Sequence, residues 1–342
     1  MRDDLDTFQR SVHEPKSGHS YSNQKGYDII GDIHGCGDTL IILLLKLGYQ
    51  HEDGCYRHPT RKAVFVGDII DRGPHILEAL AVVKAMVDNG AALCILGNHE
   101  INALAYTTQR PVTNAENSLH REFVRPHNAR NNRQISETLT QFAAYPELWR
   151  TYLDWFMTLP LYLELDGMRV VHACWDDNVV NRLIKEHSGP YIDKAFLIAT
   201  CDYASFEARA IDTLTRGTDL PLPNKRKMTG SDGLTRGFFR TKFWARNPKS
   251  FKDVVFQPDP LPDDLLDYPL DESHTRHLLE YGGHEPPVFV GHYWLQGKPK
   301  PIKDNIACVD YSAVKYGRMV AYRYSGEQTL NEDHFEWVYV DP

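Results

Sequence analysis

The stretch that decides the fold runs from Tyr27 to Gly35, Tyr-Asp-Ile-Ile-Gly-Asp-Ile-His-Gly, where a short strand pattern passes directly into a polar motif. Two further motifs follow apolar runs in the same way, Gly-Asp-Ile-Ile-Asp-Arg-Gly at 67–73 and Gly-Asn-His-Glu at 97–100. Together they supply carboxylates, imidazoles, an amide and a guanidinium. These groups can hold two metal ions and a phosphate, so the motifs and their order indicate a metal site that binds a phosphate group.

The first hundred residues alternate between strand and helix patterns. Strands are predicted at 27–30, 63–66 and 92–96, and helices at 38–47 and 76–87. Repeated strand–loop–helix units favour an α/β fold with strands covered on both faces. Each motif then lies at the C-terminal end of its strand, where open α/β sheets bind their ligands.

The rest of the chain is less regular. Further strands are predicted at 161–165, 168–171, 287–291, 306–310, 319–324 and 335–340. We expect a flexible N-terminal arm over 1–26 and a single domain over 27–342, with an elaboration at about 176–285. Because that elaboration begins and ends beside candidate site histidines, it is predicted to form a lid or wall that selects the substrate. The alternative is a solvated insertion that packs on the outside.

The composition is that of an ordinary globular protein, with 42% apolar and 25% charged residues in 342. A net charge of −8 repels polyanions, so nucleic acid is not an expected partner. The longest aliphatic run, Leu40–Leu45, is far shorter than the roughly 20 residues that cross a membrane. Six scattered cysteines without a Cys-x-x-Cys pair favour free thiols and a cytoplasmic protein. The oligomeric state stays open.

The ligand types predict two metal sites that share one carboxylate. Asp32 and His34 lie two residues apart at a strand end and so share a face. Asp68 ends the neighbouring strand, and its two oxygens can bridge two ions. The first site is predicted to use Asp32, His34 and Asp68, and the second Asp68, Asn98, His172 and His292. Mixed carboxylate, amide and imidazole ligands suit Mn²⁺, Fe or Zn²⁺ better than Ca²⁺.

Three residues beside these ligands are candidates for catalysis. Asp71 can orient His99 for proton transfer, because a carboxylate commonly fixes an imidazole in this way. Arg72 suits a bidentate contact with phosphate. A plain surface ion pair is the alternative for Asp71 and Arg72.

Weaker candidates for substrate binding lie later in the chain. Arg236 and Arg240 are four residues apart, and one of them can add a second phosphate contact; a solvated pair is the alternative. Tyr311 can line the pocket, and core packing is the alternative there.

The motifs resemble those of calcineurin-like metallophosphoesterases, specifically a bacterial-type branch of the phosphoprotein phosphatase superfamily. The pattern there is Gly-Asp-x-His-Gly, Gly-Asp-x-x-Asp-Arg-Gly and Gly-Asn-His-Glu/Asp, followed by two later histidines, here His172 and His292. The resemblance implies two mixed β-sheets in a central sandwich flanked by helices. It also implies the ligand roles given above, with His99 and Asp71 as the proton-donating pair. The eukaryotic C-terminal pattern is missing, and Leu96 stands where those enzymes usually carry Arg.

These observations predict a dinuclear-metal-dependent phosphoric monoester hydrolase, most simply with two Mn²⁺ ions and a metal-bridging water that attacks phosphorus. The expected substrate is a phosphoprotein carrying phosphate on Ser/Thr or Tyr, or else a small phosphorylated molecule. The first alternative is hydrolysis of a dinucleoside polyphosphate such as diadenosine tetraphosphate, and a phosphodiesterase comes third. An inactive phosphatase-like scaffold is the alternative outside the enzymes, although no predicted ligand is missing.

Overall fold

A computed structural model describes residues 24–110, 123–229, 235–256 and 261–340. The predicted arm over 1–26 lies largely outside the described residues, and the first strand, β1, begins at Gly26. Within the described ranges, no helix combines the length and the apolar character needed to span a membrane.

The first sheet contains the three strands that precede the motifs. In the described part of the chain it has six strands in the order β14-β15-β1-β4-β5, with β16 on β15. The strands are β1 (Gly26–Ile30), β4 (Arg61–Phe65), β5 (Ala92–Cys94), β14 (Asp310–Tyr311), β15 (Arg318–Tyr324) and β16 (Phe335–Tyr339). The pairs β1–β4 and β4–β5 are parallel. Their carboxyl ends therefore meet at one edge.

The second sheet brings the later histidines to the same region. Its order is β13-β12-β7-β6, with strands β6 (Tyr162–Leu165), β7 (Met168–Val171), β12 (Val288–Val290) and β13 (Ile306–Cys308). The strands β6 and β7 form a hairpin, while β12 runs parallel to both β7 and β13. The residues that follow β7 and β12 are His172 and, one position further on, His292.

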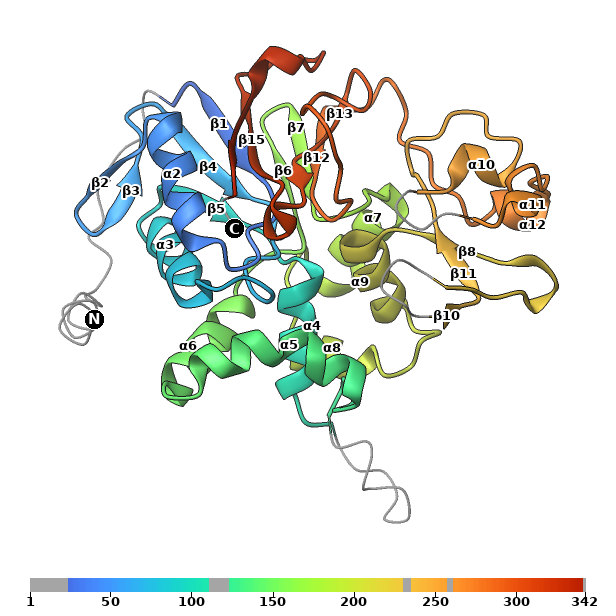
Figure 1. Cartoon of the computed structure of the whole chain (residues 1–342), viewed down its shortest axis with the longest axis horizontal. Helices are drawn as coiled ribbons and strands as arrows, with labels where there is room; N and C mark the ends of the chain where they lie inside the picture. Colours follow the sequence, from blue (N-terminus) through green and yellow to red (C-terminus); the bar gives the residue numbers. More distant parts are fainter. Residues whose placement is uncertain (1–23, 111–122, 230–234, 257–260, 341–342) are drawn as a thin grey trace.

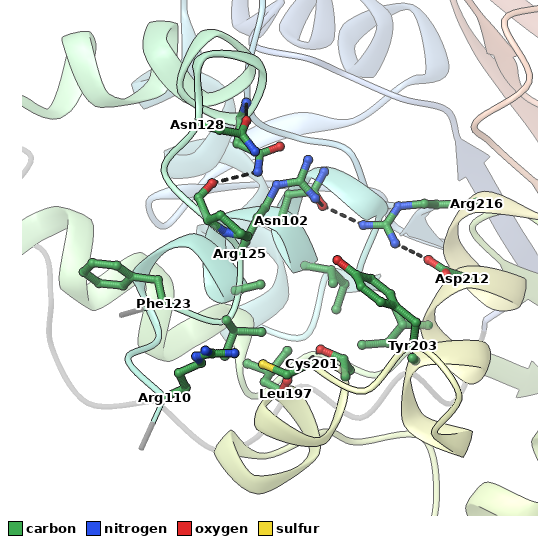
Figure 2. A pocket seen from close by; sticks show the side chains of 18 of the residues that line it. Asn102, Arg110, Phe123, Arg125, Asn128, Leu197, Cys201, Tyr203, Asp212 and Arg216 are labelled. Atoms are coloured by element: carbon green, nitrogen blue, oxygen red, sulfur yellow. Dashed lines mark hydrogen bonds and ion pairs between the residues drawn. The ribbon is translucent and has the colours of Figure 1, made fainter. Parts of the chain in front are cut away.

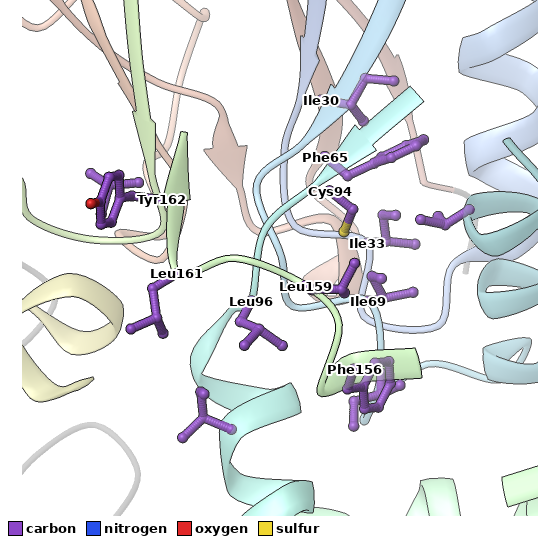
Figure 3. Close-up of a cluster of buried hydrophobic side chains, with 14 of the residues drawn as sticks. Ile30, Ile33, Phe65, Ile69, Cys94, Leu96, Phe156, Leu159, Leu161 and Tyr162 are labelled. Atoms are coloured by element: carbon purple, nitrogen blue, oxygen red, sulfur yellow. The ribbon is translucent and has the colours of Figure 1, made fainter. Parts of the chain in front are cut away.

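Alternation along the strands divides each sheet into two apolar faces. On β4, Val64 packs in the core that also holds Phe289 of β12, so this core lies between the sheets. The neighbouring Phe65 and Ala63 instead join the larger core that contains the helices. Figure 3 shows this helix-facing side. Strands buried on both faces explain why each reads as a continuous apolar run.

Helices cover the outer faces of the sandwich (Figure 1). They are α2 (Gly37–Leu47), α3 (Ile76–Asp88), α4 (Asn98–Thr107), α5 (Ala129–Phe142), α6 (Pro146–Phe156), α7 (Asp177–His187), α8 (Lys194–Ala199) and α9 (Phe206–Arg216). The helix α2 ends at Gly48, whose φ of 93° continues the chain into the short hairpin of β2 (Gln50–Glu52) and β3 (Cys55–Arg57). The observed layers confirm the predicted sandwich of two sheets between helices.

The segment predicted as an elaboration over 176–285 divides into two parts. Its helices α7, α8 and α9 contribute buried side chains to the main core. The remainder, which we call the β8–α12 lobe, has a small core of its own that includes Leu220, Phe239 and Phe251. The lobe contains β8 (Asp219–Pro221), β9 (Met228–Thr229), β10 (Thr235–Arg236), β11 (Phe238–Arg240), α10 (Phe251–Val254), α11 (Asp263–Leu266) and α12 (Glu272–Thr275). Figure 1 shows it projecting to one side of the sandwich.

Candidate metal centre

The predicted ligands converge because they follow strands whose carboxyl ends share one edge. Asp68 lies at the centre of the cluster. Its Oδ2 is 3.6 Å from His34 Nε2 and 3.3 Å from His172 Nε2, and its other oxygen accepts a hydrogen bond from the backbone N–H of His99. His292 completes a group with Asp68 and His172 in which the ligand atoms lie within 4.8 Å of one another. The central place of Asp68 is compatible with its predicted role as a bridging ligand, which stays a prediction.

The imidazoles of His34 and His172 present the same nitrogen to the centre. Nδ1 of His172 donates to the Val66 carbonyl at 2.7 Å, and Nδ1 of His34 donates to the Ile70 carbonyl at 3.0 Å. Each Nε2 therefore points inward and can offer its lone pair to a cation when it carries no proton. Among the described residues, Nε2 of both His34 and His292 is buried without a hydrogen-bond partner. The buried Nε2 of His34, 3.6 Å from an oxygen of the Asp68 carboxylate, fits a cation.

Asn98 adds a neutral group to the same point. Its Oδ1 lies 2.8 Å from His292 Nδ1 and 3.3 Å from His172 Nε2. With the amide turned over, its nitrogen instead donates to both imidazoles. The amide can therefore offer an oxygen to a cation or a hydrogen bond to the histidines without it.

The buried carboxylates and imidazoles of the cluster shift one another's pKa values. Burial alone would lower the pKa of His172, but the carboxylates of Asp68 and Asp32 outweigh it and raise the pKa to about 10. Burial, together with the nearby Asp310 carboxylate, raises the pKa of Asp32 well above its usual range. A proton on His172 therefore partly neutralises these carboxylates, and divalent ions would displace it. The donor set and its charge both fit divalent ions.

Several site residues have a left-handed backbone. The φ values are 45° for His34, 52° for Asp68, 69° for Asp71, 75° for Arg72 and 66° for His292. For residues with a side chain, this conformation costs on the order of 1–3 kcal/mol each and is retained mainly at functional sites. It lets the chain turn sharply at the strand end and aim consecutive side chains into the centre.

Two glycines make room for the ligands. A Cβ on Gly97 would lie 2.2 Å from Asp68 Oδ1, and one on Gly291 would lie 2.1 Å from Asp32 Oδ1. Neither carboxylate could keep its place beside a larger residue. The glycines of the motifs thus serve close packing around the ligands.

His99 is held by a chain of hydrogen bonds next to this centre. Its Nδ1 lies 2.6 Å from Asp71 Oδ2, and Arg72 Nη2 donates to its Nε2 at 3.2 Å. A guanidinium can only donate, so Nε2 of His99 accepts the hydrogen bond from Arg72. Nδ1 therefore carries the hydrogen and donates a hydrogen bond to Asp71. The hydroxyl of Thr138 on α5 donates to the other oxygen of Asp71. The imidazole is therefore fixed in one tautomer and orientation.

Arg72 lies at the exposed mouth of the site. Its guanidinium stacks over the ring of Trp294, with Cζ at 4.4 Å from the ring centroid. Lys315 approaches the same ring, with Nζ at 3.9 Å. The sequence offered no signal for Trp294, because its place beside Arg72 depends on how the two sheets meet.

Glu100, the last residue of the third motif, holds two motif loops together. Its fully buried carboxylate accepts four backbone N–H groups, those of Asp68 and Ile69 at 2.8 Å, Gly97 at 3.0 Å and Ile70 at 3.3 Å. The loop that carries the central Asp68 is thereby tied to the start of α4. Glu100 was assigned no role from the sequence, although its place at the end of the Gly-Asn-His-Glu motif was a usable signal.

Replacing Glu100 by Gln should destabilise the metal-free protein by about 2–4 kcal/mol, because an amide N–H₂ would face backbone donors that now bind a carboxylate oxygen. Urea unfolding followed by circular dichroism measures this. The matched control is Glu147→Gln on α6, whose side chain is 79% exposed and should stay within about 0.5 kcal/mol of wild type. Equal midpoints for all three proteins would contradict the role given to Glu100.

The structure places the three weaker substrate-binding candidates in different surroundings. The positive charge of Arg240 on β11 is among the causes that lower the pKa of His292, after burial, so it lies near the second predicted metal site. Arg236 lies on β10, opposite Met228. Tyr311 is only 3% exposed, packs in the core between the sheets, and its hydroxyl accepts the N–H of Lys300. The structure therefore brings Arg240 toward the centre and places Tyr311 in the core.

The elaboration reaches the site through an aromatic cluster. The ring of Tyr293, directly after His292, contacts Trp244 and Phe256 of the β8–α12 lobe with ring centroids 5.0 Å apart in each pair. The lobe is thus anchored next to a predicted ligand. Its predicted role as a lid or wall stays a prediction.

Several curated relatives of the chain carry the same name. An asymmetrical bis(5′-nucleosyl)-tetraphosphatase PrpE from Halalkalibacterium halodurans is 47% identical over 25% of this chain and 35% of its own length. The PrpE of Bacillus cereus is 36% identical over 47% of this chain and 62% of its own. The chain thus spans less than two thirds of the length of these relatives.

A solved structure, a cold-active protein-tyrosine phosphatase of Shewanella sp., matches 96% of this chain and 87% of its own length at 16% identity and a TM-score of 0.49. A likeness this weak does not bear on substrate.

The prediction of a phosphoprotein phosphatase is wrong, because the curated relatives are named as nucleotide tetraphosphatases. The alternative of a dinucleoside polyphosphate fits them better. The physical reason lies in what the motifs encode. The motifs supply ligands for a metal centre that can serve the hydrolysis of many phosphate esters. The leaving group is instead recognised by residues around the metal centre that lie outside the motifs.

The family match covers most of the chain. The family model described as calcineurin-like phosphoesterase matches residues 27–295, a range that includes every predicted metal ligand. It confirms the predicted resemblance and, together with the clustered histidines and carboxylates, implies divalent metal ions. The chain belongs to the calcineurin-like phosphoesterase family.

Proposed function

We propose that the protein is a metal-dependent hydrolase of dinucleoside tetraphosphates, a small phosphorylated substrate. The chemical part of the proposal is carried by Asp68, whose Oδ2 lies within 3.9 Å of Nε2 of His34, His99 and His172. The names of the curated relatives support the substrate part. The cytoplasmic location stays a prediction.

The ligand residues would hold two divalent ions around the shared carboxylate. One ion would be held by Asp32, His34 and Asp68, and the other by Asp68, Asn98, His172 and His292. When bound, two such ions activate water and clamp the oxygens of the phosphoryl group. Of the metals that accept this mixture of ligands, we propose Mn²⁺, with Fe and Zn²⁺ as the alternatives.

The remaining residues act on the substrate itself. Arg72 binds the phosphate oxygens through its guanidinium, and in doing so it releases His99 Nε2. A water oxygen forms a bond to phosphorus, the bond from phosphorus to the leaving oxygen breaks in line, and the proton of the attacking water passes to solvent. His99, held at Nδ1 by Asp71, takes up a proton from solvent at the Nε2 that Arg72 has released and passes this proton to the leaving oxygen.

Protein that is stripped with a chelator and reloaded with Mn²⁺ should convert diadenosine tetraphosphate into two unequal products, AMP and ATP. Chromatography of the nucleotides measures both the rate and the product ratio, with the stripped protein as control. Parallel assays use a phosphopeptide and a bis-aryl phosphodiester. Faster turnover of either one would overturn the substrate class, and full activity without metal would overturn the mechanism.

Metal analysis separates this enzyme from the inactive scaffold. A functional centre should retain close to two ions per chain after gentle reloading. Fewer than about one ion per chain, together with no turnover of any phosphate ester, would favour the scaffold.

A further inference from the structure

A cavity of about 530 Å³ lies beside the metal centre, between α4, α9 and the segment that leads into α5. Figure 2 shows the side chains that line it. Arg125, Arg130 and Arg216 supply guanidinium groups, Asn102 supplies an amide, and Tyr203 lies at its rim. Its volume is in the range of sites for small organic ligands, about 300–1,000 Å³.

The cavity concentrates positive charge, because the described residues of its lining include Arg110, Arg125, Arg130 and Arg216 but a single carboxylate, Asp212, which pairs with Arg216. Arg125 and Arg216 both donate to Asn102 Oδ1, each at 2.6 Å. The second hydrogen bond of Arg125 goes to another amide oxygen, Gln134 Oε1, at 2.9 Å. Burial, followed by the charges of Arg216 and Arg130, lowers the pKa of Arg125 to about 10. Like charges that share a neutral acceptor are stabilised by an anion between them.

The cavity is close to the predicted metal ligands. Asn98 and Asn102 are one helical turn apart on α4, about 6 Å along its axis, so both side chains lie on the same face. With its amide turned over, Asn98 also donates to the carbonyl of Thr215 at 3.3 Å, and Thr215 directly precedes Arg216. A chain of phosphates that begins at the metals can therefore continue to these arginines.

Tyr203 supplies an aromatic surface at the rim. Its side chain is 85% exposed, which is unusual for a large ring, and Figure 2 shows it beside the pair of Arg216 and Asp212. Exposed rings of this kind stack on nucleobases with little dependence on the base. A positively charged, anion-binding subsite next to an exposed ring matches the phosphates and the base of a nucleotide.

We propose that this cavity binds the nucleotide half of the substrate that extends away from the metal centre, with its phosphates on Arg125 and Arg216 and its base on Tyr203. The inference rests on the proposed function for the identity of the substrate. The chemistry that it assigns, a nucleoside polyphosphate, follows from the cavity itself. The arginines thereby discriminate dinucleotides from simple phosphate esters.

The test compares a short substrate with a long one. Phenyl phosphate engages the metal centre alone, whereas diadenosine tetraphosphate also reaches the cavity. The ratio of kcat/KM for the dinucleotide to that for phenyl phosphate should fall about 10- to 100-fold in Arg125→Gln, the loss expected for a hydrogen bond to a charged group. Tyr203→Ala should lower the ratio by about 5-fold or more, and Tyr203→Phe should restore it. Arg150→Gln, an exposed arginine on α6, is the matched control and should keep the wild-type ratio.

Inhibition of phenyl phosphate hydrolysis by ATP, at saturating Mn²⁺, separates the two proposals. In one outcome, the wild type does not cleave the dinucleotide, but ATP inhibits its hydrolysis of phenyl phosphate and Arg125→Gln raises the inhibition constant for ATP at least 10-fold. The cavity proposal then stands and the proposed function fails. If the dinucleotide is cleaved, and neither Arg125→Gln nor Tyr203→Ala changes the ratio or the inhibition constant, the cavity proposal is overturned and the function stands. Equal losses on both substrates in Arg125→Gln also overturn it, because they indicate a structural role.

Discussion

Replacing His99 by Ala should lower kcat for phenyl phosphate by about 10²- to 10⁴-fold, the contribution of a general acid. The loss should be smaller for diadenosine tetraphosphate. Its leaving group is a phosphate, whose second pKa of about 6 makes protonation less necessary than for a phenol with a pKa near 10. Steady-state kinetics with the two substrates, on protein loaded with Mn²⁺, measures the difference.

Metal content distinguishes a general acid from a ligand at this position. Nε2 of His99 is 3.9 Å from Asp68 Oδ2, and His99 forms a metal-sized cluster with Asp68 and His34. The His99→Ala protein should nevertheless keep its ions, with His51→Ala on the exposed β2 strand as control. If the variant loses metal, or loses the same factor on both substrates, the assignment as proton donor is incorrect.

Asp68→Asn should remove at least one ion per chain and lower kcat/KM for diadenosine tetraphosphate by about 10²–10³ or more. The substitution keeps the size of the side chain, and Oδ1 can still accept the N–H of His99. It removes the negative charge from the position that faces His34 and His172. Elemental analysis of the reloaded protein and kinetics on the same sample measure the two effects together.

The control for this charge removal is Asp88→Asn on α3. Asp88 is an exposed carboxylate that pairs with Lys84 and lies outside the metal cluster, so metal content and turnover should match wild type. Two retained ions in Asp68→Asn would contradict a bridging position for Asp68. In that case, the two ions would have to be held by separate ligand sets.

Secondary structure was largely predictable because strands buried on both faces leave continuous apolar runs. The strand predicted at 168–171 is β7 with the same bounds, and the helix predicted at 38–47 is α2, which begins one residue earlier at Gly37. The hairpin of β2 and β3 was missed, since its first strand, Gln50–Glu52, is polar and exposed. Periodicity carries no signal where a strand buries nothing.

The residue types at the candidate site were predictable for a related reason. A ligand that directly follows a strand is positioned by the strand, so its approximate place can be read from local sequence. Thr138 and Asp310 had no such signal. Thr138 lies on α5, 67 residues after the Asp71 that it contacts, and Asp310, the first residue of β14, raises the pKa of Asp32 although β14 and β1 are separated by β15 in the sheet. Partners joined only by packing leave no local pattern.

The sequence by itself determined the kind of chemistry, because the motifs place carboxylates, an amide and imidazoles at strand ends and those groups prefer divalent ions. The sequence also indicated Asp68 as the shared carboxylate, because Asp68 ends a strand and carries two oxygens. Only the tertiary structure decided how closely His172 approaches Asp68, since that approach depends on the second sheet packing on the first. It also decided where a substrate can extend. The cavity gathers Arg125 and Arg216 around Asn102 from segments up to 114 residues apart, and charges brought together over such distances are invisible until the chain is folded.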